Sequence, residues 1–333
     1  MSSVSVSPQS SSVRLIECPR DAMQGIHDFI PTEKKVAYIN SILKCGFDTV
    51  DFGSFVSPKA IPQMRDTAEV LSKLDHSCIY SPVQHASSDV RLHKKSSDDR
   101  GRMTDANSSS RPTSVFRHPS KLLAIVANAR GAQDACSFDQ ITYLGFPFSI
   151  SETFQQRNTN SSIAESLKRV EEIQSLCVKN KKELVIYISM AFGNPYGEIW
   201  NAGIAIDWVK KISQLGIKIF ALSDTIGVSN SENISYLFSN LIPAFPQLEI
   251  GAHLHTTPDT WEEKIVAAYE SGCRRFDSAI KGFGGCPMAT DKLTGNMPTE
   301  NLLSFFNKKE IPTGIHSNAF LDAMKMASKI FPI

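Results

Sequence analysis

The 333-residue chain lacks the features that mark membrane proteins and nucleic-acid-binding proteins. Its 35 basic and 34 acidic residues leave a net charge of +1, so no overall positive field favours nucleic acid. Its longest apolar runs, such as residues 183–192, are too short to span a bilayer, which takes about 20 residues. We therefore expect a protein that binds neither nucleic acid nor a membrane.

The chain also lacks paired cysteines and a secretion signal. Its seven cysteines are dispersed, which favours reduced thiols over a disulfide framework. Residues 1–12 have neither the basic and apolar regions of a signal peptide nor the arginines of a mitochondrial presequence. These absences predict a cytoplasmic protein with a disordered tail over residues 1–12.

Short, β-branched apolar runs alternate with helical patterns through the rest of the chain. They predict strands over residues 13–19, 49–55, 121–128, 140–148, 183–192, 218–224, 249–255 and 274–280. Helices are predicted over residues 31–45, 61–74, 162–180, 202–215, 231–241 and 258–271. Near-continuous apolar strands imply a parallel sheet covered by helices, and eight such units in roughly 270 residues fit a closed barrel. The predicted fold is therefore α/β, a (β/α)8 TIM barrel that forms a single catalytic domain over residues 13–333.

One stretch interrupts this alternation. Residues 78–119 hold nine serines between Ser81 and Ser114, clustered charges and few large apolar groups. Such a composition cannot bury enough surface to offset its ordering entropy. We interpret it as a disordered, low-complexity insertion between helix 2 and strand 3, on the barrel face opposite the usual catalytic face.

Polar residues gather where the predicted strands end. Because the carboxyl ends of barrel strands meet at one mouth, we expect these side chains to converge. In chain order they are Arg20, Asp21, Asp51, Asp224, His253, His255 and the glycine-rich loop over residues 282–287.

His253 and His255 are the strongest candidates for a metal site. Alternate residues of a strand point to the same side, so both imidazoles can face one cation; a hydrogen-bonded histidine pair is the alternative. Asp21 lies opposite them at the barrel mouth, although an aspartate there also suits a helix cap or an ion pair. Such nitrogen and oxygen ligands suit Mg2+ or Mn2+, and zinc stays open.

Arg20 and Cys286 are candidates for the chemistry itself. The fork of the Arg20 guanidinium suits an oxyanion or enolate, and a structural ion pair is the alternative. Cys286 is flanked by glycines and a proline, so a loop movement can bring its thiol to the site. The alternative is a buried cysteine that only packs.

At these residues the chain resembles the 3-hydroxy-3-methylglutaryl-CoA lyase family, which consists of barrel metallolyases related to isopropylmalate and homocitrate synthases. The resemblance runs from about residue 13 to 305, without the insertion, and its motifs are residues 19–24 (PRDAMQ), 54–59 (SFVSPK), 62–64 (PQM), 224–228 (DTIGV), 253–255 (HLH) and 284–287 (GGCP). The SFVSPK and GGCP stretches are typical of the lyases and distinguish them from the synthases.

The resemblance implies a homodimeric enzyme that cleaves 3-hydroxy-3-methylglutaryl-CoA to acetyl-CoA and acetoacetate by retro-Claisen chemistry, a reaction of leucine degradation and ketone-body formation. It implies Asp21, His253, His255 and Asn296 as ligands of Mg2+ or Mn2+. It further implies that Arg20 stabilises charge on the thioester oxygen and that Cys286 is a mobile acid/base. Proton transfer would be supported by Asp51 and Asp224, with His253 or Asp51 as the base.

Some positions depart from the family pattern. Cys18 and Ala22 stand where glycines are usual, Asp51 stands where glutamate is usual, and Met288 replaces a common aromatic residue. A related 3-hydroxyacyl-CoA is therefore an alternative substrate. Two further functions also stay open: a condensing synthase that joins acetyl-CoA to a 2-oxo acid, and a catalytically silent barrel that only binds a partner.

Overall fold

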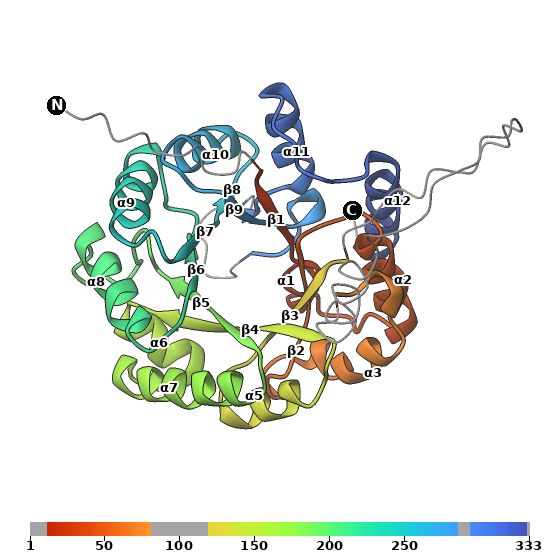
Figure 1. The fold of residues 1–333 in the computed structure, drawn as a ribbon, viewed down its shortest axis with the longest axis horizontal. Coiled ribbons are helices and arrows are strands. Elements are labelled where there is room, and N and C mark those ends of the chain that lie inside the picture. Colours follow the sequence, from red (N-terminus) through yellow and green to blue (C-terminus); the bar gives the residue numbers. More distant parts are fainter. Residues whose placement is uncertain (1–11, 81–118, 286–293, 332–333) are drawn as a thin grey trace, which may run out of the picture.

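A computed structural model describes residues 12–80, 119–285 and 294–331. Eight parallel strands close into a barrel in the order β1-β2-β3-β4-β5-β6-β7-β9, and helices surround it (Figure 1). This confirms the predicted TIM barrel and all eight of its strands. The strands are β1 (Arg14–Glu17), β2 (Thr49–Ser54), β3 (Lys121–Ile125), β4 (Ile141–Ser149), β5 (Glu183–Ser189), β6 (Ile219–Ser223), β7 (Glu249–His253) and β9 (Arg275–Ser278).

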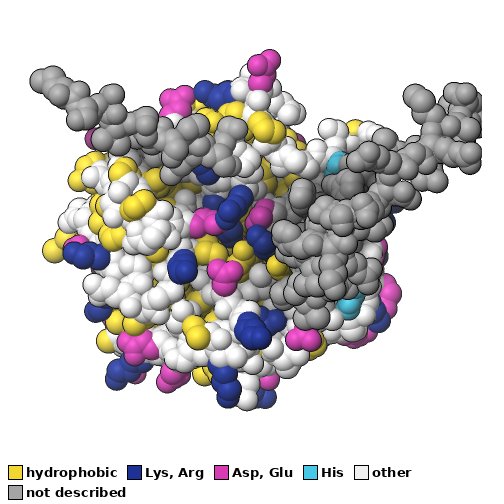
Figure 2. All heavy atoms as spheres, in the orientation of Figure 1, with side chains coloured by type: hydrophobic (Ala, Val, Ile, Leu, Met, Phe, Trp, Pro, Cys, Tyr) yellow, Lys and Arg dark blue, Asp and Glu magenta, His cyan; other side chains and the backbone are white. Residues whose placement is uncertain are grey.

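Apolar residues fill both sides of the strands, as the near-continuous apolar runs predict. Along β5, Leu184 and Ile186 belong to the core between strands and helices, whereas Val185 and Tyr187 belong to a second cluster inside the barrel. This alternation follows from the two-residue period of a strand. On the face shown in Figure 2, basic and acidic side chains are interspersed over the middle of the barrel. Among the helices described, none is long and apolar enough to cross a membrane.

The outer helices include those predicted, one of which is interrupted, and several that the sequence pattern did not indicate. They are α2 (Thr32–Leu43), α3 (Thr67–Ser72), α5 (Ala129–Cys136), α6 (Glu152–Thr159), α7 (Ile163–Lys179), α8 (Ala202–Ser213), α9 (Ser231–Ala244), α10 (Trp261–Glu270), α11 (Thr299–Lys308) and α12 (Ser317–Ile330). The helix predicted over residues 61–74 is a short 3-10 turn, η1 (Pro62–Met64), followed by α3. At this break the Thr67 hydroxyl donates to the Met64 carbonyl (2.8 Å) and accepts from the Ser54 amide (3.1 Å), which ties the start of α3 to the end of β2.

The first strand is shorter than predicted. It ends at Glu17, and a helix, α1 (Pro19–Gln24), begins where residues 13–19 were expected to be extended. Proline suits the first position of a helix because its φ is already helical and the missing N–H has no partner there. Arg20 and Asp21 therefore lie on a helix and not on a strand end.

The seventh strand is interrupted at Leu254. Residues up to His253 stay in the barrel, but β8 (His255–Thr256) leaves it and pairs antiparallel with β10 (Gly295–Asn296). In this pairing His255 stands opposite Asn296. The break therefore brings a distant segment of the chain to the barrel mouth.

The two ends of the predicted insertion lie side by side. Cys78 closes a 3-10 turn, η2 (His76–Cys78), and Ile79 forms a parallel bridge with Ser120. The Tyr80 amide donates to the Ser120 carbonyl and the Ser120 amide to the Cys78 carbonyl, each at 2.9 Å. The rest of the insertion, residues 81–118, and residues 1–11 of the predicted tail lie outside the described residues.

We predict that residues 81–118 can be replaced by about six glycines and serines, which span about 13 Å. Since Ile79 and Ser120 are already paired, the barrel should keep its fold. The free energy of unfolding should rise by about 1–2 kcal/mol, because bringing the ends of a shorter loop together costs less conformational entropy on folding. Urea unfolding followed by circular dichroism measures this. A fall of more than about 2 kcal/mol would instead mean that the segment packs against the barrel.

Candidate active site at the carboxyl ends of the strands

A cavity of about 340 Å³ opens at the carboxyl ends of the barrel strands. Polar groups from six elements or their ends converge on it, most of them at strand ends as the sequence pattern predicts. Those polar residues are Arg20, Asp21 and Gln24 from α1, Asn158 and Thr159 from α6, Tyr187 and Ser189 from β5, Ser223 and Thr225 around the end of β6, His253 from β7 and His255 from β8. Its apolar wall includes Val56, Ile61, Ile125 and Phe154.

Asp21, His253 and His255 form a cluster that fits a metal ion. Their potential ligand atoms lie within 4.8 Å of one another. The Nε2 atom of His255 is buried and has no hydrogen-bond partner among the described residues. Its Nδ1 atom lies 3.1 Å from the Thr225 carbonyl, so Nε2 is left for a ligand. The side-chain amide of Asn296 donates to Asp21 Oδ2 (2.7 Å), which brings the fourth predicted ligand into the cluster.

The electrostatics of the three residues also suit a cation. Burial, with the neighbouring His253, lowers the pKa of His255 to about 4, so this imidazole is neutral and can act as a ligand. Burial lowers the pKa of His253 as well, but the hydrogen bond and charge of Asp277 outweigh it and the pKa is raised. Burial opposes ionisation of Asp21, yet Arg20 and the histidines hold its pKa below the usual range.

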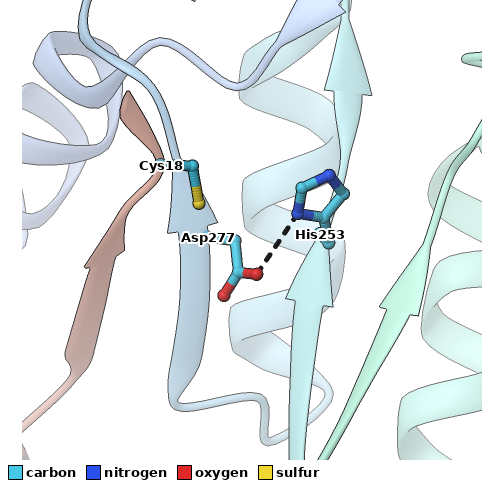
Figure 3. A group of neighbouring side chains, drawn as sticks. All are labelled: Cys18, His253 and Asp277. Atoms are coloured by element: carbon cyan, nitrogen blue, oxygen red, sulfur yellow. Dashed lines mark hydrogen bonds and ion pairs between the residues drawn. The ribbon is translucent and has the colours of Figure 1, made fainter. Parts of the chain in front are cut away.

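Asp277 orients His253 from behind. Its Oδ2 atom lies 3.2 Å from His253 Nδ1, which leaves the Nε2 side of the ring for the cavity (Figure 3). A carboxylate in this position fixes the tautomer and the orientation of a ligating imidazole. The residues present therefore fit a metal centre in which both histidines act through Nε2.

Arg20 is held in the cavity wall by two aspartates. Its Nε atom donates to both oxygens of Asp51 (3.0 and 3.2 Å), and Nη1 donates to Asp21 (2.9 Å) and Gln24 (2.9 Å). Asp51 is 0% exposed and lies behind the guanidinium instead of lining the cavity. Burial raises the pKa of Asp51 to about 6, although the charge of Arg20 acts in the opposite direction. The guanidinium is thus fixed before any substrate binds.

Asp224 does not line the cavity, although Ser223 and Thr225 on either side of it do. Its carboxylate accepts from Lys264 Nζ (2.8 Å) and from the amide of Ser229 (3.0 Å). Lys264 also donates to the carbonyl of His255 (2.8 Å). The structure therefore places Asp224 where it supports the backbone at His255. Cys286 lies outside the described residues, while the preceding Gly285 lines the cavity.

Sequence reasoning missed several residues of the site, among them Gln24, Tyr187 and Asp277. Tyr187 and Ser189 occupy alternate positions near the end of β5, the same spacing that points to His253 and His255. Asp277 is an acid within a strand that is buried throughout, which is a signal for a paired or ligating group. Gln24 contacts both Arg20 and Asp21.

These features define a class: a TIM-barrel enzyme with a candidate metal centre at the carboxyl ends of its strands. The HMGL-like family profile matches residues 13–327. The chain belongs to this family, and the resemblance stated from its motifs is confirmed.

The relatives are carbon–carbon lyases. The chain is 28% identical over 311 residues to the hydroxymethylglutaryl-CoA lyase YngG of Bacillus subtilis, covering 92% of this chain and 89% of that protein. It is 29% identical to the 3-hydroxy-3-isohexenylglutaryl-CoA/hydroxymethylglutaryl-CoA lyase of Pseudomonas aeruginosa, covering 93% and 90%. Among solved structures, an HMG-CoA lyase of Acinetobacter baumannii in complex with coenzyme A and 3-methylmalate has a TM-score of 0.77 at 27% identity, covering 98% and 93%.

We predict that Asp277→Asn weakens Mn2+ binding by about 10–100-fold, because the amide no longer fixes the tautomer of His253. The fold should persist, since the change removes a buried charge whose Oδ1 atom has no partner among the described residues. Calorimetric titration of the metal-free protein with Mn2+ measures the affinity. Asp322→Asn, at an exposed position on α12, is the control. Equal affinity in both variants would contradict the positioning role.

Proposed function

We propose that the chain cleaves 3-hydroxy-3-methylglutaryl-CoA to acetyl-CoA and acetoacetate. The observation that carries the proposal is the cluster of Asp21, His253 and His255 beside a fixed Arg20 in one cavity. The names of the relatives support the same reaction. The apolar part of the cavity wall would accept the 3-methyl group, and a related 3-hydroxyacyl-CoA with a larger apolar group is the alternative substrate.

The proposed cofactor is Mg2+ or Mn2+, held by Asp21, His253, His255 and the amide oxygen of Asn296. Bound there, the ion would polarise the substrate's 3-hydroxyl and a neighbouring oxygen and so lower the pKa of that hydroxyl. Two imidazoles with two oxygen ligands leave room for substrate oxygens in a six-coordinate shell.

Two residues are candidates to accept the hydroxyl proton. His253 lines the cavity, but its Nδ1 faces Asp277 and its Nε2 belongs to the ligand cluster. Asp51 has a pKa near 6, close to the value that suits a general base at neutral pH. Asp51 lies behind Arg20 and does not line the cavity, so His253 and Asp51 both stay candidates for the acceptor.

Arg20 and Cys286 complete the proposed reaction. As the C2–C3 bond breaks, negative charge develops on the thioester oxygen, and the fixed guanidinium of Arg20 would stabilise it. Cys286 would then deliver a proton to C2 of the enolate, which gives acetyl-CoA. Asp224 supports the site through Lys264. We further propose that the enzyme acts as a cytoplasmic homodimer in leucine degradation and ketone-body formation.

The reaction is tested by acetoacetate release from 3-hydroxy-3-methylglutaryl-CoA with and without Mg2+ or Mn2+. We expect turnover only with the ion, and His255→Ala should lose most of it together with its cation affinity, because an inner ligand is removed. His76→Ala, on the turn next to the insertion, is the control. Metal dependence that is unchanged in His255→Ala would refute the ligand assignment, and no acetoacetate under any condition would refute the reaction.

We also predict that Cys286→Ser lowers kcat by about 10²–10⁴-fold with little change in KM. Serine is nearly the size of cysteine but far less acidic than a thiol, so binding should survive and proton transfer should not. Steady-state kinetics at several pH values measure the effect, and Cys273→Ser, a buried cysteine on the other side of the barrel wall, is the control. Normal kcat in Cys286→Ser would leave this residue a packing role only.

A further inference from the structure

A second group of potential ligands lies behind the first and shares His253 with it. Cys18, His253 and Asp277 offer ligand atoms that all lie within 4.8 Å of one another (Figure 3). Cys18 joins β1 to α1, His253 ends β7, and Asp277 lies in β9. All three residues are nearly inaccessible, at 1%, 9% and 3% exposed.

Two of these groups have free ligand atoms. The Oδ1 atom of Asp277 is buried and has no hydrogen-bond partner among the described residues. The Cys18 sulfur makes a long contact, 3.9 Å to the Ile16 carbonyl. Buried polar atoms without partners are rare in proteins, and each one calls for a missing ligand or water.

The geometry does not support Cys18 as a nucleophile. The Cys18 thiol donates to the Ile16 carbonyl, and the Nδ1 atom of His253 is hydrogen-bonded to Asp277, so His253 cannot accept the thiol proton there. Burial, and then the charges of Asp277, Asp51 and Asp21, raise the pKa of Cys18 far above its ordinary value. Without a cation the thiol is therefore neutral. The same carboxylates that disfavour a bare thiolate would favour a divalent cation bound to it.

We propose that Cys18, His253 and Asp277 form a second cation site, selective for a thiophilic divalent ion such as Zn2+, Cd2+ or Co2+. A tetrahedral zinc site with bonds of about 2.0–2.1 Å to N and O has an N–O edge of about 3.3 Å. The hydrogen bond from His253 Nδ1 to Asp277 Oδ2 is 3.2 Å long, so an ion could take the place of the proton between these two atoms, with the unpartnered Oδ1 atom beside it. Edges to a sulfur ligand are about 3.6 Å, and the present separations are within 4.8 Å, so the Cys18 sulfur needs to move by no more than about 1.2 Å.

The two sites exclude each other because they use the same imidazole. In the first site His253 would bind through Nε2 and carry its proton on Nδ1. In the second it would bind through Nδ1, so the ring proton moves to Nε2 and the Cys18 thiol releases its proton to solvent. A neutral imidazole has only one free lone pair. A thiophilic ion would therefore prevent loading of Mg2+ or Mn2+.

The test is a titration of the metal-free protein with Co2+, whose bond to a thiolate gives a charge-transfer absorption in the near ultraviolet. We expect this band in the wild type and in His255→Ala, which lacks only the first site. It should vanish in Cys18→Ala and Cys18→Ser. Both Cys18 variants should still bind Mn2+, which shows that they are folded. Cys286→Ala should keep the band, which separates the two thiols.

Competition provides the second measurement. Cd2+ should release bound Mn2+ from the wild type, and at least about tenfold more Cd2+ should be needed for Cys18→Ser. A cobalt band that persists in both Cys18 variants, or that is lost only in Cys286→Ala, would overturn the proposal. Equal Cd2+ sensitivity of wild type and Cys18→Ser would do the same. Failure of Mn2+ to bind the wild type would instead count against the first site and the proposed function.

Discussion

The pairing of β1 with β9 is the constraint on which the site depends. It sets Leu15 opposite Phe276 and Glu17 opposite Ser278, and it continues one residue further through the Cys18 amide, which donates to the Ser278 carbonyl (2.9 Å). Closing the barrel in this register fixes where α1 begins. Asp21 then lies beside the end of β7. In sequence, all five strands from β2 to β6 separate these two residues. A register shift of one residue would turn the lumen-facing side chains outward.

Closure of the barrel brings several carboxylates together around the cavity. Around the cavity, the carboxylates of Asp21, Asp51 and Asp277 are buried beside the guanidinium of Arg20. Buried charges are costly unless they are paired, and breaking such a pair is costlier still. The carboxylates outnumber the guanidinium of Arg20, and Asp277 is offset in part by His253, whose pKa it raises, and by the nearby charge of Arg275. A cation bound beside Asp21 would offset more of this negative charge. The donor set of Asp21, His253 and His255 is thus compatible with a bound cation.

The sequence predicts the barrel and most of the site because these follow from local periodicity. Apolar runs locate the strands, and polar residues at their ends converge by topology alone. The sequence does not predict which side of a strand each polar residue faces, or which distant segments pair. Both sides of β6 are apolar, so nothing local shows that Ser223 and Thr225 face the cavity while Asp224 faces Lys264. Likewise, the break at Leu254 and the pairing of His255 with Asn296 arise from contacts between distant segments.

Asp277 takes part in both proposed cation sites: it would orient His253 in the first and act as a ligand in the second. In the proposed first site, the carboxylate on Nδ1 would orient His253 as a ligand through Nε2, so its removal would weaken that site. The same carboxylate is also a ligand of the proposed competing site, together with His253 and the thiol of Cys18. The family motif usually has glycine at that position, and glycine offers no ligand. Selectivity between hard and thiophilic ions in this chain would therefore rest on one residue that touches neither substrate nor the first metal.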